Sequence, residues 1–169
     1  MKYLLMVTLL ASMSFAKDGN KTKIFRDVDD MTDEVSYMTS ESITLKNGRK
    51  ALNIFAGLIE NENGVNPFSL AVIHKRLGSC SEKDLFIILL ENGVKIKSKS
   101  WNDFNCKGYS YFNFTSREWA ELGKSPIKKI MFKNGRSYET ISQKVDVSDK
   151  NYFITMIELL KKKQFTKRK

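Results

Sequence analysis

The sequence predicts a β-dominated α+β domain, an antiparallel sheet or sandwich of about eight strands with a short helix near 116–123 and a C-terminal helix near 149–163. The first observation is that Asn-Gly dipeptides, which are typical of type I′ hairpin turns, separate apolar segments at 47–48, 92–93 and 134–135. The second is an apolar stripe at helical spacing after the last of these hairpins. Strands joined by tight turns pair antiparallel, and a helix with one apolar face packs on them.

The expected strands follow from short apolar or alternating runs bounded by turn residues. They are 34–45, 50–59, 68–77, 85–90, 94–99, 109–114, 127–132 and 137–145. The run LFIILL at 85–90 is continuously apolar, which predicts a strand covered on both faces. The run VKIKSK at 94–99 alternates, which predicts a strand with one exposed face. We therefore expect a sheet with a buried middle and exposed margins.

Two helices interrupt the strand pattern. Thr115 and Glu118 have the spacing of a capping box, and Gly123 followed by Pro126 ends this short segment. The second helix begins at 148–149 and places its apolar side chains on one stripe. These are Tyr152, Phe153, Met156, Ile157, Leu159 and Leu160. We expect this stripe to belong to the core rather than to bind a partner.

The N-terminal segment, residues 1–16, has the order of a cleavable signal peptide. Lys2 gives it a positive start, an apolar run follows, and small residues lead to Ala16. The apolar run is shorter than the roughly 20 residues that cross a bilayer, which disfavours a membrane anchor. We therefore expect cleavage near Ala16 and a periplasmic or secreted product, with one globular domain over 17–163 and a basic disordered tail over 164–169.

The two cysteines, Cys80 and Cys106, are expected to form a disulfide, because an exported chain enters an oxidising compartment. Closing a loop of this length contributes about 3.5 kcal/mol in the chain-entropy model. A redox-active pair is the alternative, although the spacing is not C-x-x-C. With His74 as the single histidine, the chain lacks a four-ligand zinc set, so we expect no metal and no cofactor.

The net charge of +10 is concentrated at the C-terminus. The tail carries these cations and no acid: Lys161, Lys162, Lys163, Lys167, Arg168 and Lys169. Without them, and without Lys2 of the leader, the domain has a charge of about +3. A terminal run of like charge is usually solvated and disordered. The functional alternative is that the tail binds anionic membrane, lipopolysaccharide or nucleic acid.

The acidic opening over 27–34 offers the oxygen ligands that Ca²⁺ favours, but it lacks the spacing of an EF-hand, and its residues also form ordinary turns. Within 25–33, the run Asp29-Asp30-Met31-Thr32-Asp33 resembles the start of small exported bacterial proteins of unassigned function with an Asp-x-Met-Thr-Asp-type opening. The run Phe104-Asn105-Cys106 is similar to a Phe-Asn-Cys element in such proteins. The resemblance implies a β-rich secreted domain and transfers no catalytic residue.

Signatures of an enzyme do not assemble in this sequence. His74 lies in an expected strand, and the chain has no G-x-S-x-G turn, P-loop or G-x-G-x-x-G motif. Glu118 and Glu121 share a helix face, which is typical of solvated surface. A small secreted hydrolase with an unrecognised site is therefore the alternative to a binding protein.

The best candidate for a ligand surface is an aromatic segment. Tyr109 and Tyr111 point to the same side of their expected strand, and Trp101 and Lys107 lie nearby in the sequence. Packing in the core is the other interpretation of these rings. We expect an exported, non-enzymatic binding or interaction protein of the cell envelope. Its partners would be envelope anions or another exported protein, and export disfavours nucleic acid.

Overall fold

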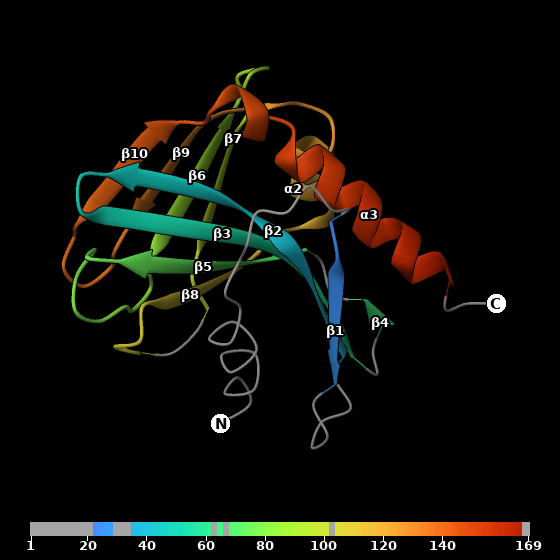
Figure 1. The fold of residues 1–169 in the computed structure, drawn as a ribbon, viewed down its shortest axis with the longest axis horizontal. Helices are drawn as coiled ribbons and strands as arrows, with labels where there is room; N and C mark the ends of the chain where they lie inside the picture. The colour runs from blue at the N-terminus through green and yellow to red at the C-terminus, as the bar shows by residue number, and fades with distance from the viewer. Residues whose placement is uncertain (1–21, 29–34, 62–63, 66–67, 102–103, 167–169) are drawn as a thin grey trace.

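The computed structural model describes residues 22–28, 35–61, 64–65, 68–101 and 104–166, which form two stacked antiparallel sheets with two α-helices toward one end (Figure 1). The strands are β1 (Ile24–Val28), β2 (Val35–Asn47), β3 (Lys50–Asn61), β4 (Gly64–Val65), β5 (Ser69–Lys75), β6 (Leu85–Leu90), β7 (Lys95–Lys99), β8 (Tyr109–Asn113), β9 (Ile127–Lys133) and β10 (Thr140–Lys144). The helices are α2 (Ser116–Leu122), the short 3₁₀ helix η1 (Val147–Asp149) and α3 (Tyr152–Thr166). The β-dominated α+β class is confirmed. The expected signal segment lies outside the described residues.

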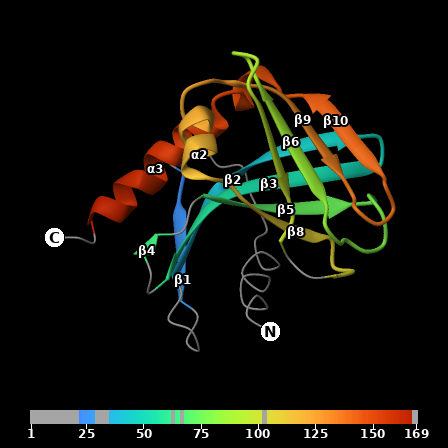
Figure 2. The ribbon, with the colours of Figure 1, turned by 180° about the vertical axis from the view of Figure 1, so that it is seen from behind.

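Strand order, which local sequence patterns leave undetermined, divides the strands between two sheets. The first sheet has the order β1-β2-β3-β5-β8, with β4 pairing with β3. The second has the order β10-β9-β6-β7. In Figure 1 strands β2, β3 and β5 lie in front of the second sheet, and Figure 2 shows β6, β9 and β10 from behind. The arrangement is a sandwich with a core between the two inner faces.

The core contains phenylalanine side chains from both sheets. The ring of Phe112 on β8 lies 5.2 Å from that of Phe86 on β6, measured between centroids. It lies 6.4 Å from the ring of Phe132 on β9, in an edge-to-face arrangement. Because alternate residues of each strand point inward, the two sheets bury one continuous apolar cluster.

Strand β6 departs from expectation. Phe86, Ile88 and Leu90 are buried, whereas the three residues that alternate with them are only half-buried. The expectation of cover on both faces is wrong, because the main contacts of β6 are with its neighbours β7 and β9, and the described helices pack instead on the first sheet and on each other. Strand β7 alternates as expected and exposes one face.

The hairpins expected at three Asn-Gly dipeptides are confirmed as β2–β3, β6–β7 and β9–β10. Their turns are not of the type I′ form, which needs positive φ at both central residues. Positive φ occurs at Gly48 (58°) and Gly93 (85°) but not at the asparagines before them. In the third turn the left-handed residue is Tyr138, with φ of 60°.

Both helices have the local features that the sequence predicts. The Thr115 hydroxyl accepts from the Glu118 N–H at 3.3 Å, and the Glu118 carboxylate accepts from the Thr115 N–H at 2.8 Å, which completes the capping box. Helix α3 ends at Thr166, somewhat beyond the expected end near 163. Its apolar stripe is core: Tyr152, Phe153, Met156, Ile157 and Leu160 are buried, and Leu159 packs against them.

Tyr152 joins α3 to an irregularity in the first sheet. Between Met38 and Ser42 the pairing of β2 with β3 shifts register, and Ala56 lies opposite the bulged residues. The N–H of Ala56 donates to the Tyr152 hydroxyl at 3.0 Å, and its carbonyl accepts from the Thr39 hydroxyl at 3.1 Å. The Tyr152 hydroxyl donates to the Glu41 carbonyl at 2.8 Å. Side chains thus satisfy the peptide groups that the bulge removes from the strand ladder.

Candidate functional site

The disulfide between Cys80 and Cys106 is confirmed, with an S–S distance of 2.02 Å. It lies beside an isolated β-bridge in which Ser81 and Asn105 each donate an N–H to the other's carbonyl, at 2.7 and 3.1 Å. The disulfide therefore fastens the loop around Asn105 to the segment that enters β6.

His74 lies on β5, next to this disulfide. Its side chain is 5% exposed, and its Nε2 is hydrogen-bonded to the hydroxyl of Ser81. Its Nδ1 has no hydrogen-bond partner among the described residues. Burial lowers the pKa of His74, and the negative charge of Asp84 partly opposes this effect. The imidazole is therefore held in its neutral form.

Asp84 is buried directly before β6, and its carboxylate is hydrogen-bonded to residues other than His74. Its carboxylate accepts from the Ser110 hydroxyl and, at 2.8 Å, from the Gly135 N–H. A catalytic Ser-His-Asp arrangement needs the carboxylate on Nδ1 of histidine and an accessible hydroxyl. Ser81 is fully buried, and Asp84 is used elsewhere, so these residues do not form such a triad. Their polar bonds instead connect the ends of several strands.

Three of the four predicted ligand residues, Trp101, Tyr109 and Tyr111, come together on the outer face of the first sheet. The rings of Trp101 and Tyr111 stack with centroids 5.4 Å apart, and Tyr109 packs against the same cluster. Tyr111 is 4% exposed, and burial raises its pKa. Lys107 is exposed in the neighbouring loop. The rings pack with a second, smaller apolar cluster: Met38, Phe55, Ala71 and Ile73. Their use as a ligand surface stays a prediction.

The basic C-terminal residues are described only in part. Lys161 and Lys162 are exposed near the end of α3, and Lys163 also belongs to this helix. Lys167, Arg168 and Lys169 lie outside the described residues. The predicted Ca²⁺ alternative falls mostly on residues 29–34, which also lie outside them.

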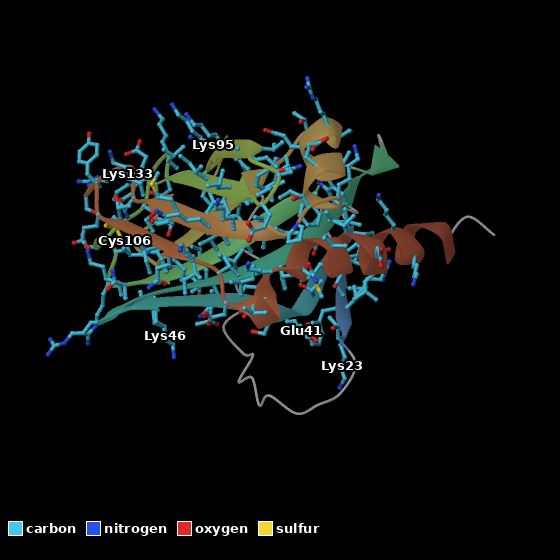
Figure 3. All side chains as sticks on the ribbon, turned by 90° about the horizontal axis from the view of Figure 1, so that it is seen from above. Lys23, Glu41, Lys46, Lys95, Cys106 and Lys133 are labelled. Carbon is cyan, nitrogen blue, oxygen red and sulfur yellow. A yellow bond between two sulfur atoms is a disulfide. The ribbon has the colours of Figure 1, made fainter. Side chains whose placement is uncertain are left out.

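The outer face of the second sheet carries a group of cations that no sequence motif marks. Strand pairing places its residues in three rows across β7, β6, β9 and β10. The rows are Lys99, Leu85, Lys133 and Thr140; then Lys97, Ile87, Met131 and Ser142; then Lys95, Leu89, Lys129 and Lys144. We call this set the lysine face. Lys95 and Lys133 project from the side of the molecule opposite Lys23 and Lys46 (Figure 3).

The lysine face has an aliphatic centre and a cationic margin. Leu85, Ile87, Leu89 and Met131 are half-buried along its middle, and the lysines lie on both sides of them. None of its twelve positions is an acid, and none of its lysines forms an ion pair with a carboxylate that the structure describes. Lysine side chains cover apolar neighbours with their stems while the ammonium group stays in water.

Two acids near the ends of these strands pair with lysines outside the lysine face. Glu91 lies 2.7 Å from Lys150, and Glu139 lies 3.0 Å from Lys50. The pKa of Glu91 is lowered, first by the hydrogen bond from Lys150 and also by the charges of Lys128 and Lys144.

This arrangement suits an extended anionic surface better than a small ligand. Lysine acts as a point charge on a flexible stem, so it attracts phosphate without fixing one geometry. Six such charges on one sheet face form a broad positive area. In the sequence, only strand β7 indicates part of the lysine face, because Lys95, Lys97 and Lys99 alternate with inward residues. The remaining lysines join them only through the strand order, which the sequence does not reveal.

Among the residues that the structure describes, no group of three His, Cys, Asp or Glu side chains is placed to hold a metal ion. The described helices include none that is both long and apolar enough to cross a membrane. No protein-family model, no curated protein and no solved structure matches this chain. The resemblance to small exported proteins therefore stays a prediction.

Proposed function

We propose that this protein is an exported binding protein that attaches to the anionic lipid surface of the cell envelope through the lysine face. The observation that carries the proposal is the set of six lysines around a half-buried aliphatic row, with no acid among them. Residues 1–16 predict that the protein is exported, and an exported protein meets the anionic lipid surfaces of the envelope.

The size of the face supports simultaneous contact by its lysines. Strands in a sheet are about 4.8 Å apart, so four strands present a face roughly 15 Å wide. The Debye length at physiological salt is about 8 Å, and each lysine held near an anionic leaflet contributes about 1 kcal/mol. Six lysines on one sheet face therefore supply several kcal/mol of attraction.

The side-chain chemistry favours lipid over nucleic acid. Single-stranded nucleic acids bind through stacking on aromatic rings, and none of the twelve positions of the lysine face is aromatic. None is arginine, the residue that recognises phosphate by two parallel hydrogen bonds. Leucine, isoleucine and methionine side chains suit the boundary between headgroups and acyl chains.

Charge reversal on opposite sides of the molecule tests the proposal. The double variant Lys97→Glu with Lys129→Glu changes the lysine face, and Lys23→Glu with Lys46→Glu makes the same charge change on the other side. Binding is measured with vesicles of phosphatidylcholine with and without phosphatidylglycerol. We expect the first variant to lose more than about thirtyfold in affinity for anionic vesicles and the control to lose only a few-fold.

Melting temperatures of both variants establish that the fold is kept. Equal losses in the two variants, or no binding of the native protein to anionic vesicles, would contradict the proposal. A third variant, in which Lys161, Lys162, Lys163, Lys167, Arg168 and Lys169 are all replaced by glutamine, separates the lysine face from the predicted basic tail. If that variant alone loses binding, the tail is the attachment site and the proposal fails.

A further inference from the structure

The turn between β9 and β10 presents an aromatic side chain at the edge of the lysine face. Tyr138 is 69% exposed and Phe104 is 49% exposed, which are high values for rings of this size. The Nζ atom of Lys133 lies 4.9 Å from the centroid of the Tyr138 ring. The guanidinium carbon of Arg136 lies 4.9 Å from the centroid of the Phe104 ring. Since Lys133 belongs to the lysine face, Tyr138 borders that face, and Phe104 lies beside the same turn.

The turn is held in place by the buried side chain of Asn134. Its Oδ1 accepts from the N–H groups of Arg136 at 2.9 Å and Ser137 at 2.8 Å. Its Nδ2 donates to the carbonyl of Cys80 at 2.9 Å, next to the disulfide. The N–H of Tyr138 donates to the Asn134 carbonyl at 3.0 Å. The ring is therefore carried by a fixed turn rather than by a loose loop.

The backbone at Tyr138 is in a conformation that tyrosine rarely adopts. Its φ of 60° lies in the left-handed region, where a side chain is crowded and glycine is preferred. Gly135 in the same turn packs so closely on the carbonyl oxygens of Glu82 and Lys83 that no side chain fits there. Its N–H is bound by Asp84. Arg76 and Lys83 also have positive φ, so what distinguishes Tyr138 is its exposure together with its contact with Lys133.

We propose that Tyr138, with Phe104 beside it, is the interfacial anchor of the lysine face. The ring of Tyr138 enters the headgroup layer of an anionic bilayer, so the β9–β10 edge of the face lies deepest. Tyrosine is enriched at this depth because its ring is apolar and its hydroxyl is polar. Lys133 and Arg136, which lie over the two rings, pair with the surrounding lipid phosphates. The inference rests on the proposed function, since it concerns the orientation of the same face.

Replacing Tyr138 by glycine separates anchoring from folding. Glycine accepts a φ of 60° without strain, so Tyr138→Gly is expected to keep or raise the melting temperature. The same variant is expected to bind anionic phosphatidylglycerol vesicles about tenfold more weakly and to bind soluble polyphosphate unchanged. Val147→Gly is the matched control, because Val147 is 85% exposed and lies outside this turn.

A fluorescent variant measures depth directly. Tyr138→Trp is expected to bind vesicles like the native protein, to shift its emission to the blue and to be quenched by lipids brominated near the headgroup. Val147→Trp is expected to show no shift beyond that of the native tryptophans. Unchanged vesicle binding by Tyr138→Gly, an equal loss on polyphosphate, or an unshifted Tyr138→Trp overturns the inference. None of these outcomes contradicts the proposed function, which the charge reversal at Lys97 and Lys129 tests separately.

Discussion

At the scale of single residues, the most informative side chain is His74. It is the single histidine of the chain, it is buried beside Ser81, and its Nδ1 has no partner in the described part of the structure. A neutral imidazole tolerates this site, because Nε2 is bonded to Ser81 and Nδ1 can remain an unprotonated acceptor without a partner. A protonated imidazole has two donors, and one of them would be buried without an acceptor.

The folded protein is therefore expected to lose stability as the pH falls through the range in which histidine titrates. In the unfolded chain His74 has its ordinary pKa of 6.5, and in the folded protein that pKa is lowered. At pH values between these two pKa values, the unfolded state binds more protons than the folded state, so the free energy of unfolding rises with pH. It reaches its full value above pH 6.5. Melting temperatures from about pH 5 to pH 8 measure this dependence.

Substituting the ring isolates its contribution from that of the carboxyl groups. His74→Gln keeps a polar side chain that does not titrate, so the difference between the native and variant curves belongs to His74. Two parallel curves would mean that His74 does not couple folding to protons.

How far a residue's role could be predicted depends on how far away its partners lie in the sequence. The capping box of Thr115 and Glu118 is local, and the disulfide joins the only two cysteines, so both could be predicted. The role of Asn134 could not be predicted from the sequence. An Asn-Gly dipeptide indicates a turn, but nothing local shows that the asparagine reaches the carbonyl of Cys80.

At the scale of elements, the bulge in β2 is completed by a side chain from α3. The Tyr152 hydroxyl accepts a hydrogen bond from the N–H of Ala56, which has no acceptor on β2 because of the bulge. The same hydroxyl donates to the Glu41 carbonyl. Burial raises the pKa of Tyr152, so its hydroxyl stays neutral and available as a donor at ordinary pH. One hydroxyl thus couples the helix to both strands.

Removing that hydroxyl is expected to destabilise the protein more than an ordinary loss of one hydrogen bond. Tyr152→Phe leaves the Ala56 N–H buried without its acceptor, which costs about 1–3 kcal/mol. The free energy of unfolding in urea measures the effect. Tyr138→Phe is a suitable control, since Tyr138 is exposed and its hydroxyl should contribute little. Equal stability of the two variants would contradict the role given to Tyr152.

Most strands could be predicted because alternation and Asn-Gly turns are local signals. The error at β6 has a physical cause. A continuous apolar run shows that both faces of a strand are apolar, but it does not show that an element covers each of them. Leu85, Ile87 and Leu89 are apolar on the half-buried face at the centre of the lysine face. The local rule fails at the surface that we propose to be functional, as is common for such sites.

At the scale of the whole molecule, the distribution of charge matters more than its total. The sequence shows a net charge of +10 and a basic C-terminus, and both are visible without a structure. The lysine face is not, because Lys95 on β7 and Lys129 on β9 come into one row only through Leu89 of β6. Such a face attracts an extended anionic surface from a distance set by the salt concentration.

Binding to anionic vesicles is therefore expected to weaken as salt rises. Between about 50 and 500 mM salt the Debye length falls from roughly 14 to 4 Å, so the lysines are progressively screened. The slope of log affinity against log salt should be shallower for the Lys97→Glu, Lys129→Glu variant. Tyr138→Gly should keep the native slope while binding more weakly at every salt concentration. A salt-independent affinity of the native protein would exclude an electrostatic attachment.

The link between Tyr152 and the bulge in β2 also constrains the order in which the chain can fold. Thr39 and Tyr152, whose hydroxyls lie 3.1 Å apart, are separated by 113 positions. The strands of the first sheet all lie before residue 114, but the Ala56 N–H gains its acceptor only when Tyr152 has been synthesised. Contacts of such long sequence separation form slowly. The bulge in β2 is therefore completed by a contact that spans most of the domain and forms late in folding.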